Sequence, residues 1–314
     1  MRTWLKESFV NEKSYIIYEL EIDMKVIIFL GYKFLEFLAY ATPYPVSYFI
    51  ASSSAKMIFY TGKLANTLKK NVSIVTGLKQ NDRKVAGIVK NIYVVWFCNV
   101  TDFLKQLLIN VEKFKKRVEL SGIEYLKDSL KAGKGAVIFT AHIGNFEWGA
   151  CRVAIEGIPI WGTGLIRPYH RTNRFFEKRR LSKGLQTLYA NKMMLNTFRI
   201  LKNNGVIAIP TDYDPLGTAE VYDFFGRKAY IPSGPVEIAL KSGAPLIPSF
   251  IWRKSKYEHR QIFDKPLELE RDESKFDSRK EFIAFNMKKM IEVLEKYISE
   301  HIEEWEMFHN IWAE

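Results

Sequence analysis

Two patterns of apolar and polar positions divide this chain of 314 residues near residue 130. Between about residues 71 and 130, apolar side chains recur at the spacing of an amphipathic helix, as in VAGIVKNIYVVWFCNVTDFLKQLLINVEKF, and glycine and proline are scarce. Farther along, short apolar runs alternate with helical patterns and glycine-marked turns. The chain is therefore predicted to contain a helical region at 71–130 and an α/β domain at 131–314. The last helix of that domain is expected from about Ser278 to Glu300.

The α/β domain is predicted to be built on a mostly parallel central sheet flanked by helices, because its apolar runs are typical of buried strands. The predicted strands are AVIFT, PIWGTGLI, VIAIPTD and PLIPSFIWR. The predicted helices between them are NFEWGACRVAIEG, RTNRFFEKRRLSKG, MMLNTFRILKNNG and SGPVEIALKSG.

Residues 1–70 carry an aromatic-rich apolar run, VIIFLGYKFLEFLAYATPYPVSYFI, which begins at Val26. A spanning helix needs about 20 mostly apolar residues, and here charged residues, Pro43 and Pro45 fall within that length. We therefore predict a helical, membrane-associating segment that lies on or in the surface of a membrane. A buried helical hairpin of a soluble protein is the alternative.

The charge of the chain points to an anionic partner. There are 47 Lys and Arg against 35 Asp and Glu, a net charge of +12, which suits an anionic membrane surface, a phosphorylated substrate or nucleic acid. No nucleic-acid partner is expected, because the basic run at 167–183 matches no recognised binding module. The two cysteines, Cys98 and Cys151, lack metal-ligand spacing, so neither a zinc site nor a disulfide framework is expected. No metal or redox cofactor is implied.

The stretch FTAHIGNFEWGA is the first candidate site. His142 follows a predicted strand, and ligands of open α/β sheets bind at the carboxyl ends of strands. Gly144 permits a tight turn, Asn145 is a good helix N-cap, and Glu147 falls in the first helical turn. We expect Glu147 to accept a hydrogen bond from one ring nitrogen of His142, leaving the other as a general base. With no G-x-S-x-G elbow in the chain, that base would activate an external hydroxyl, and the helix N-terminal amides would bind an oxyanion.

A second pair has the same spacing. His301 and Glu306 lie in HIEEWEMFH, with no strand or glycine turn before them. We interpret this pair as the solvated face of a charged C-terminal helix.

Two more stretches carry candidate substrate-binding residues. In RPYHRTNRFFEKRRLSK, Arg167 follows a predicted strand and is expected to reach the crevice of the first site, where a guanidinium would bind phosphate. The other basic residues form either a solvated helix or a docking face for a membrane or an acidic carrier. In TDYDPLGTAEVYDFFGRKAYIPSGP, Asp212 ends a strand and is either a site residue or a loop cap. Gly226, Ser233 and Gly234 are the remaining candidates.

These stretches, taken in order, resemble the bacterial lipid A biosynthesis acyltransferase family, whose motif is a histidine followed five residues later by an acid. AHIGNFEWGA is similar to that motif, and the resemblance continues through Arg167-Pro168, TDYDPLG, YDFFGRKAYIPSGPVEIALKSGAPLIP and EEWEMFHNIW. It covers most of the chain from about residue 70. The resemblance implies a glycerolipid acyltransferase-like fold and a membrane anchor in the N-terminal segment.

The resemblance also implies roles for single residues. His142 would be the general base, Glu147 its orienting partner, Arg167 the arginine near an anionic part of a substrate, and Asp212 the acid after the third strand. The family usually has glutamine after that acid, whereas Tyr213 stands here.

The implied activity is transfer of a fatty acyl group from acyl carrier protein or coenzyme A to a hydroxyl of a lipid. The acceptor would be a lipid A precursor or a related glycolipid, with phosphatidylinositol mannoside or a lysophospholipid as alternatives. The implied location is the cytoplasmic face of a bacterial inner membrane. An acyl thioesterase or a non-catalytic protein that binds anionic lipid are the alternatives from other classes.

Overall fold

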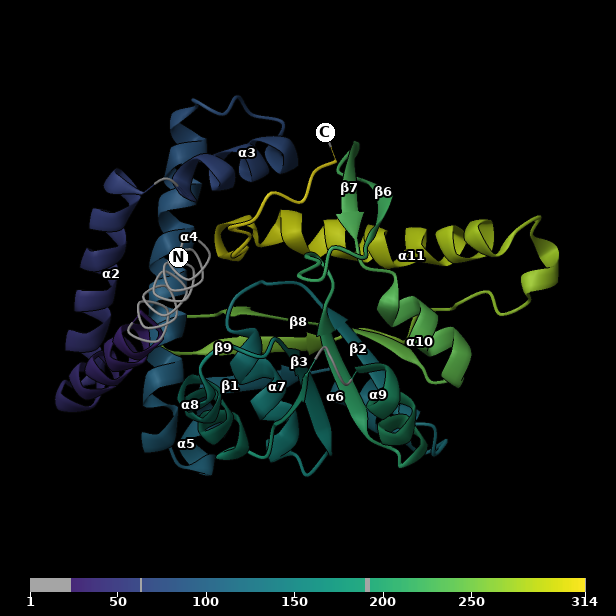
Figure 1. Cartoon of the computed structure of the whole chain (residues 1–314), viewed down its shortest axis with the longest axis horizontal. Helices are drawn as coiled ribbons and strands as arrows, with labels where there is room; N and C mark the ends of the chain where they lie inside the picture. The colour runs from purple at the N-terminus through teal and green to yellow at the C-terminus, as the bar shows by residue number, and fades with distance from the viewer. Residues whose placement is uncertain (1–23, 63, 190–192, 314) are drawn as a thin grey trace, which may run out of the picture.

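The computed structural model describes residues 24–62, 64–189 and 193–313. Its centre is a seven-stranded sheet with the order β1-β9-β8-β2-β5-β3-β4 (Figure 1). Each neighbouring pair is parallel except β8 with β9, so the predicted α/β class with a mostly parallel sheet is confirmed. The strands are β1 (Val118–Ser121), β2 (Ala136–Thr140), β3 (Ile160–Gly164), β4 (Gln186–Tyr189), β5 (Val206–Pro210), β8 (Leu246–Arg253) and β9 (His259–Phe263). A separate antiparallel hairpin consists of β6 (Glu220–Phe224) and β7 (Arg227–Ile231).

The four strands predicted from apolar runs are β2, β3, β5 and β8, and they form the middle of the sheet. The sequence did not predict β1, β4 or β9, and β1 corrects the prediction that 71–130 is helical throughout. These strands lie at or next to the sheet edges and have sequences such as VELS and QTLY. A strand with one exposed face needs no continuous apolar run, so its sequence gives a weak signal.

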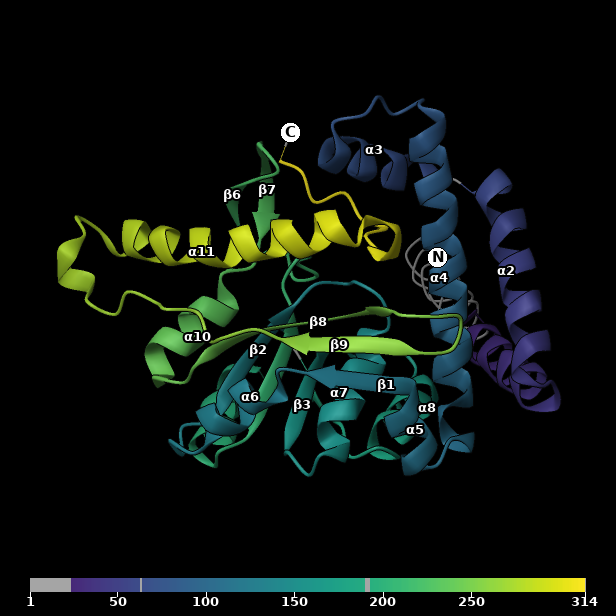
Figure 2. The same cartoon turned by 180° about the vertical axis from the view of Figure 1, so that it is seen from behind.

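The helices following the predicted strands are also as expected. A helix over 24–41 has no label in Figure 1. The others longer than one turn are α2 (Tyr44–Thr61), α3 (Leu64–Thr76), α4 (Arg83–Lys105), α5 (Val111–Arg117), α6 (Ile123–Leu130), α7 (Phe146–Ile155), α8 (His170–Leu181), α9 (Met193–Lys202), α10 (Gly234–Ser242) and α11 (Arg279–Glu300). The long helix α11 begins at Ser278, whose hydroxyl caps the Glu281 N–H. It runs along one face of the sheet, where Tyr297 stacks on Phe250 of β8 (Figure 2).

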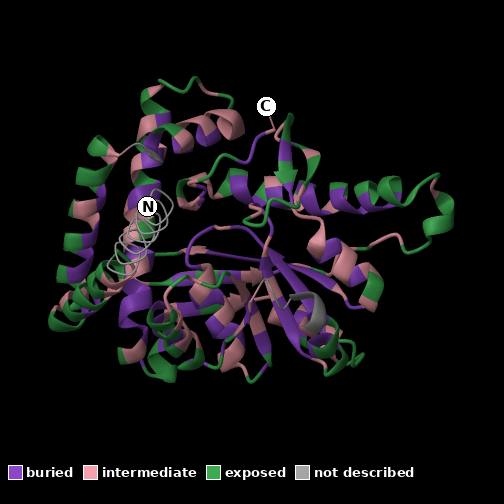
Figure 3. Cartoon of the chain, in the orientation of Figure 1, coloured by how far each residue is buried: buried purple, intermediate pink, exposed green. Residues whose placement is uncertain are grey.

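The core lies on both faces of the sheet. One buried cluster joins β2, β5 and β8 to α10 and α11, and a second joins the opposite face to α5, α6 and α7. Figure 3 shows the strands and the inner sides of these helices as buried. Burial of this apolar surface is the main source of stability and fixes the strand ends that carry the site.

The N-terminal helices pack beside the α/β unit. Segment 24–41 and α2 form the predicted helix pair, separated by a break at Thr42 and Pro43, and α2 packs along α4. Many large apolar side chains on the two helices are exposed (Figure 3). The most exposed of them are Ile27, Phe34, Phe37, Phe49, Met57 and Tyr60. Among the described residues, no helix is both long and apolar enough to cross a membrane. Residues 1–23 of the predicted 1–70 segment lie outside the described residues.

After α11, residues 301–313 form an extended C-terminal strap that returns across the molecule. Trp305 pairs with Ile143 in an isolated β-bridge, and Trp312 pairs in the same way with Ala229 of β7. Between these points, the Asn71 amide of α3 donates to the Met307 and His309 carbonyls. The strap therefore connects the loop after β2, the N-terminal helices and the β6-β7 hairpin.

Candidate active site

The loop after β2 has the predicted shape. Gly144 adopts φ of +56°, and a Cβ there would lie 2.3 Å from the Ile251 carbonyl oxygen, so both the angle and the space require glycine. Asn145 caps α7, its Oδ1 accepting a hydrogen bond from the Trp148 N–H at 3.1 Å. This turn places the side chain of His142 at the carboxyl edge of the sheet with 27% of its surface exposed.

Asp212 holds the imidazole of His142. Its Oδ1 lies 2.7 Å from Nδ1, while Oδ2 accepts hydrogen bonds from the His142 backbone N–H at 2.9 Å and the Trp305 indole N–H at 2.8 Å. The parallel pairing of Thr140 with Pro210 makes both loops leave the sheet at one edge. A carboxylate only accepts, so in the neutral ring Nδ1 carries the proton and Nε2 keeps its lone pair.

The two groups shift each other's ionisation. Burial lowers the pKa of His142, but the charge and hydrogen bond of Asp212 outweigh it, so this pKa lies above its usual value. Burial raises the pKa of Asp212, yet His142 and the indole donor together hold it below its usual value. Asp212 therefore remains ionised at neutral pH and favours the proton on Nδ1.

The expected hydrogen bond from His142 to Glu147 is not what the structure shows. Glu147 lies in the first turn of α7, as predicted, but its carboxylate pairs with Arg180 of α8, with Oε2 2.9 Å from Nε and Oε1 2.5 Å from Nη2. A bidentate guanidinium satisfies both carboxylate oxygens, so Asp212 is the ring partner instead. The basic residues of this helix were expected to form either a solvated face or a docking face, but Arg180 and the fully buried Arg179 make internal ion pairs.

The C-terminal strap completes the site, which corrects the interpretation of His301 and Glu306 as a solvated helix face. α11 ends at Glu300, and the Glu306 N–H donates to the His142 carbonyl at 2.7 Å. The Glu306 carboxylate accepts a hydrogen bond from Asn99 of α4 at 2.5 Å. Burial raises the pKa of Glu306 to about 8. The Trp-rich ending of the sequence was the available signal for this part of the site.

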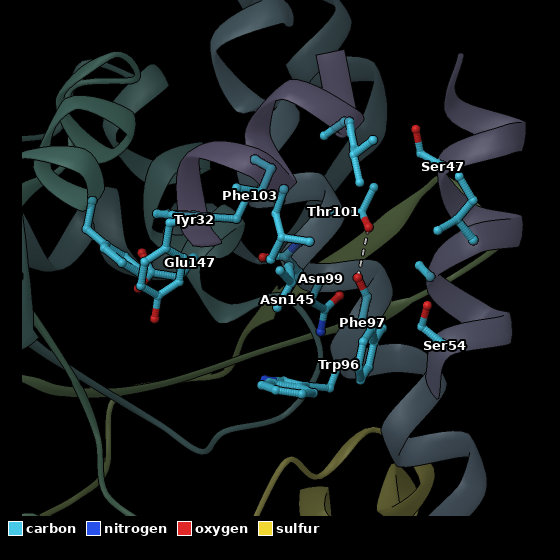
Figure 4. A pocket seen from close by; sticks show the side chains of 18 of the residues that line it. Tyr32, Ser47, Ser54, Trp96, Phe97, Asn99, Thr101, Phe103, Asn145 and Glu147 are labelled. Carbon is cyan, nitrogen blue, oxygen red and sulfur yellow. Dashed lines mark hydrogen bonds between the residues drawn. The ribbon is translucent and has the colours of Figure 1, made fainter. Parts of the chain in front are cut away.

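A cavity of about 620 Å³ lies next to this loop. Figure 4 shows Asn145 and Glu147 on one side of it and Asn99 of α4 beside them, with Ser47 and Ser54 of α2 across from Asn99. Its walls come from segment 24–41, α2, α4, α8 and the loop after β2, and most of them are apolar. A mostly apolar cavity with a few polar groups in its walls suits a ligand with a long hydrocarbon part.

Arg167 reaches this cavity, as predicted. Its guanidinium lies 3.6 Å from the centre of the Phe176 ring. The backbone N–H of Arg167 donates to Asn173 Oδ1 at 2.9 Å. None of the ion pairs among the described residues includes Arg167. Burial lowers the pKa of this guanidinium from a very high starting value, so its charge is kept and is available to an anion.

The other predicted candidates lie elsewhere. Gly226 turns the β6-β7 hairpin, Gly234 begins α10, and the Ser233 hydroxyl donates to Glu237 at 2.8 Å. None of the three lines the cavity described above. Tyr213 stacks on His309 of the strap at 4.2 Å. Among the described residues, no three His, Cys, Asp or Glu side chains are grouped to hold a metal ion.

Comparison with known proteins agrees with this architecture. Residues 18–314 match the bacterial lipid A biosynthesis acyltransferase family, and the chain belongs to that family. It is 28% identical over 162 residues to a phosphatidylinositol mannoside acyltransferase of Mycobacterium tuberculosis, covering 49% of this chain and 51% of that protein. It is also 28% identical over 142 residues to the protein of the same name from Mycolicibacterium smegmatis, covering 44% of this chain and 46% of that protein. The chain thus spans about half the length of the curated relatives it matches.

Proposed function

We propose that this protein is an acyltransferase that moves a fatty acyl group from a thioester to a hydroxyl group of a membrane lipid. The observation that carries the proposal is the imidazole of His142, held by a buried carboxylate next to an apolar cavity that the guanidinium of Arg167 also lines. Membership of the lipid A acyltransferase family supports the same reaction.

The geometry supports general-base catalysis by His142. Nε2 removes the proton of the acceptor hydroxyl, and the oxygen attacks the thioester carbonyl to form a tetrahedral intermediate. Collapse forms the C–O bond and breaks the C–S bond, and the leaving thiolate takes the proton back from the imidazolium. Asp212 stabilises the imidazolium, and a positioned base of this kind contributes roughly 10² to 10⁴ in rate.

Two other parts of the site suit the proposed reaction. The first turn of α7 has N–H groups without partners inside the helix, which would stabilise the oxyanion of the intermediate. Arg167 would bind a phosphate of the donor or the acceptor. Glu147 would orient no ring nitrogen; its pairing with Arg180 would instead fix α8 against α7 along the cavity.

The exposed apolar side chains of segment 24–41 and α2 would rest in the surface of the cytoplasmic leaflet, with the net charge of +12 attracted to anionic lipids. The acceptor would then enter the cavity from the membrane. Acyl carrier protein and acyl-coenzyme A are both candidate donors. A lipid A precursor or related glycolipid is the proposed acceptor, and phosphatidylinositol mannoside is the alternative favoured by the relatives' names.

The test is transfer of a labelled acyl group from acyl carrier protein or coenzyme A into a total lipid extract, with wild type beside His142→Ala. Label in a lipid with the wild type alone supports the proposal and identifies the acceptor. Label released only as free fatty acid would make the protein a thioesterase. Membrane binding without any turnover would make it a lipid-binding protein.

A further inference from the structure

We propose that Glu306, with Asn99 and the indole of Trp96, forms a subsite for a polyhydroxylated headgroup of the acceptor lipid, beside the hydroxyl that His142 deprotonates. This inference rests on the proposed function. It assigns a binding role to Glu306, which lies 164 positions after His142 in the sequence.

The position of Glu306 is fixed relative to the base. Its backbone N–H donates to the His142 carbonyl at 2.7 Å, so the backbone of Glu306 is joined directly to the residue that carries the imidazole. Glu306 also lines the cavity. Gly144 and Asn145, which follow His142 in the same loop, line it too, so Glu306 and the loop of the base border the same cavity.

The orientation of Asn99 leaves one oxygen of Glu306 for a ligand. Arg253 donates to Asn99 Oδ1 at 2.6 Å, so the amide NH₂ of Asn99 faces the other way. That NH₂ donates to the Gly144 carbonyl at 3.0 Å and to Glu306 Oε1 at 2.5 Å. Glu306 Oε2 makes no hydrogen bond with the described residues. A polar atom without a protein partner on a cavity wall is a binding group for a ligand or water.

The charges around Glu306 do not neutralise it as an ion pair would. Glu147, the other carboxylate of the cavity, is paired with Arg180, whereas none of the ion pairs among the described residues includes Glu306. Burial raises the pKa of Glu306 to about 8, with His142 and Arg253 as the nearby positive charges and Glu304 as a negative one. At neutral pH the carboxyl group can therefore donate one hydrogen bond and accept others.

Trp96 adds an aromatic surface beside these polar groups. It lies one helical turn before Asn99 on α4, so the two side chains share a face of the helix. Figure 4 shows them next to each other at the cavity. The indole is 37% exposed, and Phe97 and Phe308 hold it at centroid distances of 5.1 Å.

A sugar or cyclitol ring fits this combination better than an acyl chain or a thioester does. Its hydroxyl groups exchange hydrogen bonds with a carboxyl group and an amide, and its C–H face packs on an indole. An acyl chain offers no hydroxyl group. The subsite would thus select acceptors with several adjacent hydroxyl groups over acceptors with one.

The experiment compares wild type with Glu306→Ala, Glu306→Gln and Trp96→Ala. Glu303→Gln is the matched control, because Glu303 is an exposed carboxylate of the same strap, which accepts a hydrogen bond from Asn91 at 3.2 Å. The acceptors are phosphatidylinositol mannoside, a lipid A precursor and 1-acylglycerol 3-phosphate, each in detergent micelles with one acyl thioester. Hydrolysis of that thioester without acceptor is measured beside transfer.

We expect Glu306→Ala to raise the KM for the sugar-containing acceptor at least tenfold, with Glu306→Gln intermediate because an amide still forms hydrogen bonds. The preference for that acceptor over 1-acylglycerol 3-phosphate should fall by a similar factor. In the Glu306 variants, the KM for the donor should stay within twofold of wild type and hydrolysis should fall less than transfer. Glu303→Gln should leave both reactions within twofold of wild type.

An unchanged acceptor KM in the Glu306 variants, while the wild type transfers normally, would overturn the subsite alone. An equal fall in hydrolysis and transfer, with a shifted acid limb of the pH profile, would also overturn it and show that Glu306 acts through His142. If the wild type transfers to no lipid, the proposed function fails and the subsite fails with it.

Discussion

The hydrogen bond between Asp212 and His142 gives the sharpest prediction about the proposed base. In Asp212→Asn, one carboxylate oxygen becomes an NH₂ group. In the wild type, Oδ2 accepts hydrogen bonds from the His142 backbone N–H and the Trp305 indole N–H. Both donors require an oxygen acceptor at this position. The amide oxygen will therefore take the Oδ2 position, and the NH₂ will face Nδ1.

An NH₂ facing Nδ1 forces the ring into the other tautomer. Nδ1 must then accept, the proton moves to Nε2, and the nitrogen that would act as base has no lone pair. We expect kcat to fall about 10³-fold, within the range of roughly 10² to 10⁴ for loss of a positioned base. A fall of 10³ corresponds to about 4 kcal/mol of activation free energy, since each tenfold step is about 1.36 kcal/mol.

The same variant should move the pH profile. Asp212 holds the pKa of His142 above its usual value against the opposing effect of burial, and wild-type activity is lost as the pH falls through that pKa. Without the negative charge of Asp212, burial is opposed only by the weaker effects of Glu306 and Glu147, and the pKa of His142 falls. The acid limb of the residual activity should thus shift to lower pH.

The assay is transfer of labelled acyl groups from pH 5 to 9, with circular dichroism to check the fold. Asp223→Asn is the control, because Asp223 is an exposed carboxylate in a surface ion pair with Lys228. An Asp212→Asn protein that is folded and keeps more than a tenth of wild-type kcat would refute this reasoning.

Four further predictions follow from other contacts. Glu147→Gln should lower the free energy of unfolding by about 2 kcal/mol, because it breaks a partly buried ion pair, and should shift the acid limb of the pH profile less than Asp212→Asn does. An equal or larger shift would return the orienting role to Glu147. Trp305→Phe should raise the pKa of Asp212 and destabilise the fold by about 2 kcal/mol, measured by urea unfolding, since a buried carboxylate loses a donor. The unfolded chain releases the Glu306 proton near pH 4.5 and the folded chain near pH 8, so the stability of the fold falls as pH rises through that window. Glu306→Gln should therefore show a higher Tm than wild type at pH 8.5 and an equal Tm at pH 4. Equal Tm values at both pH values would contradict this. Phe49→Asp should weaken binding to anionic vesicles at least tenfold in sedimentation, because Phe49 is among the most exposed apolar residues of α2; unchanged binding would move the membrane contact elsewhere.

The local features of the site could be predicted from the sequence because they depend on neighbouring residues. The strand before His142, the glycine turn at Gly144, the Asn145 cap and the start of α7 follow from a few consecutive positions, and all are present. The middle strands were predictable for a similar reason, since a strand buried on both faces has a continuous apolar sequence.

The partner of the imidazole could not be assigned from the sequence. Asp212 lies 70 residues from His142, and its place depends on β2 and β5 pairing side by side in register. Glu147 is close in sequence, but its direction depends on Arg180 of another helix. Glu306 was interpreted as solvated because no strand or glycine turn precedes it in the sequence, and its contact with the loop after β2 joins positions far apart in the chain.

The C-terminal strap also affects how the protein is made. Trp305 lies 93 residues beyond Asp212, so the ribosome produces His142 and Asp212 well before the indole that donates to Asp212. Until the strap docks, the buried carboxylate lacks one donor and the loop after β2 lacks its bridge to Trp305. Because chains begin to fold as they emerge, the strands of the sheet are available for pairing before the strap that carries Trp305 and Glu306. Completion of the proposed site is therefore a late step of biosynthesis, after the release of at least residue 306.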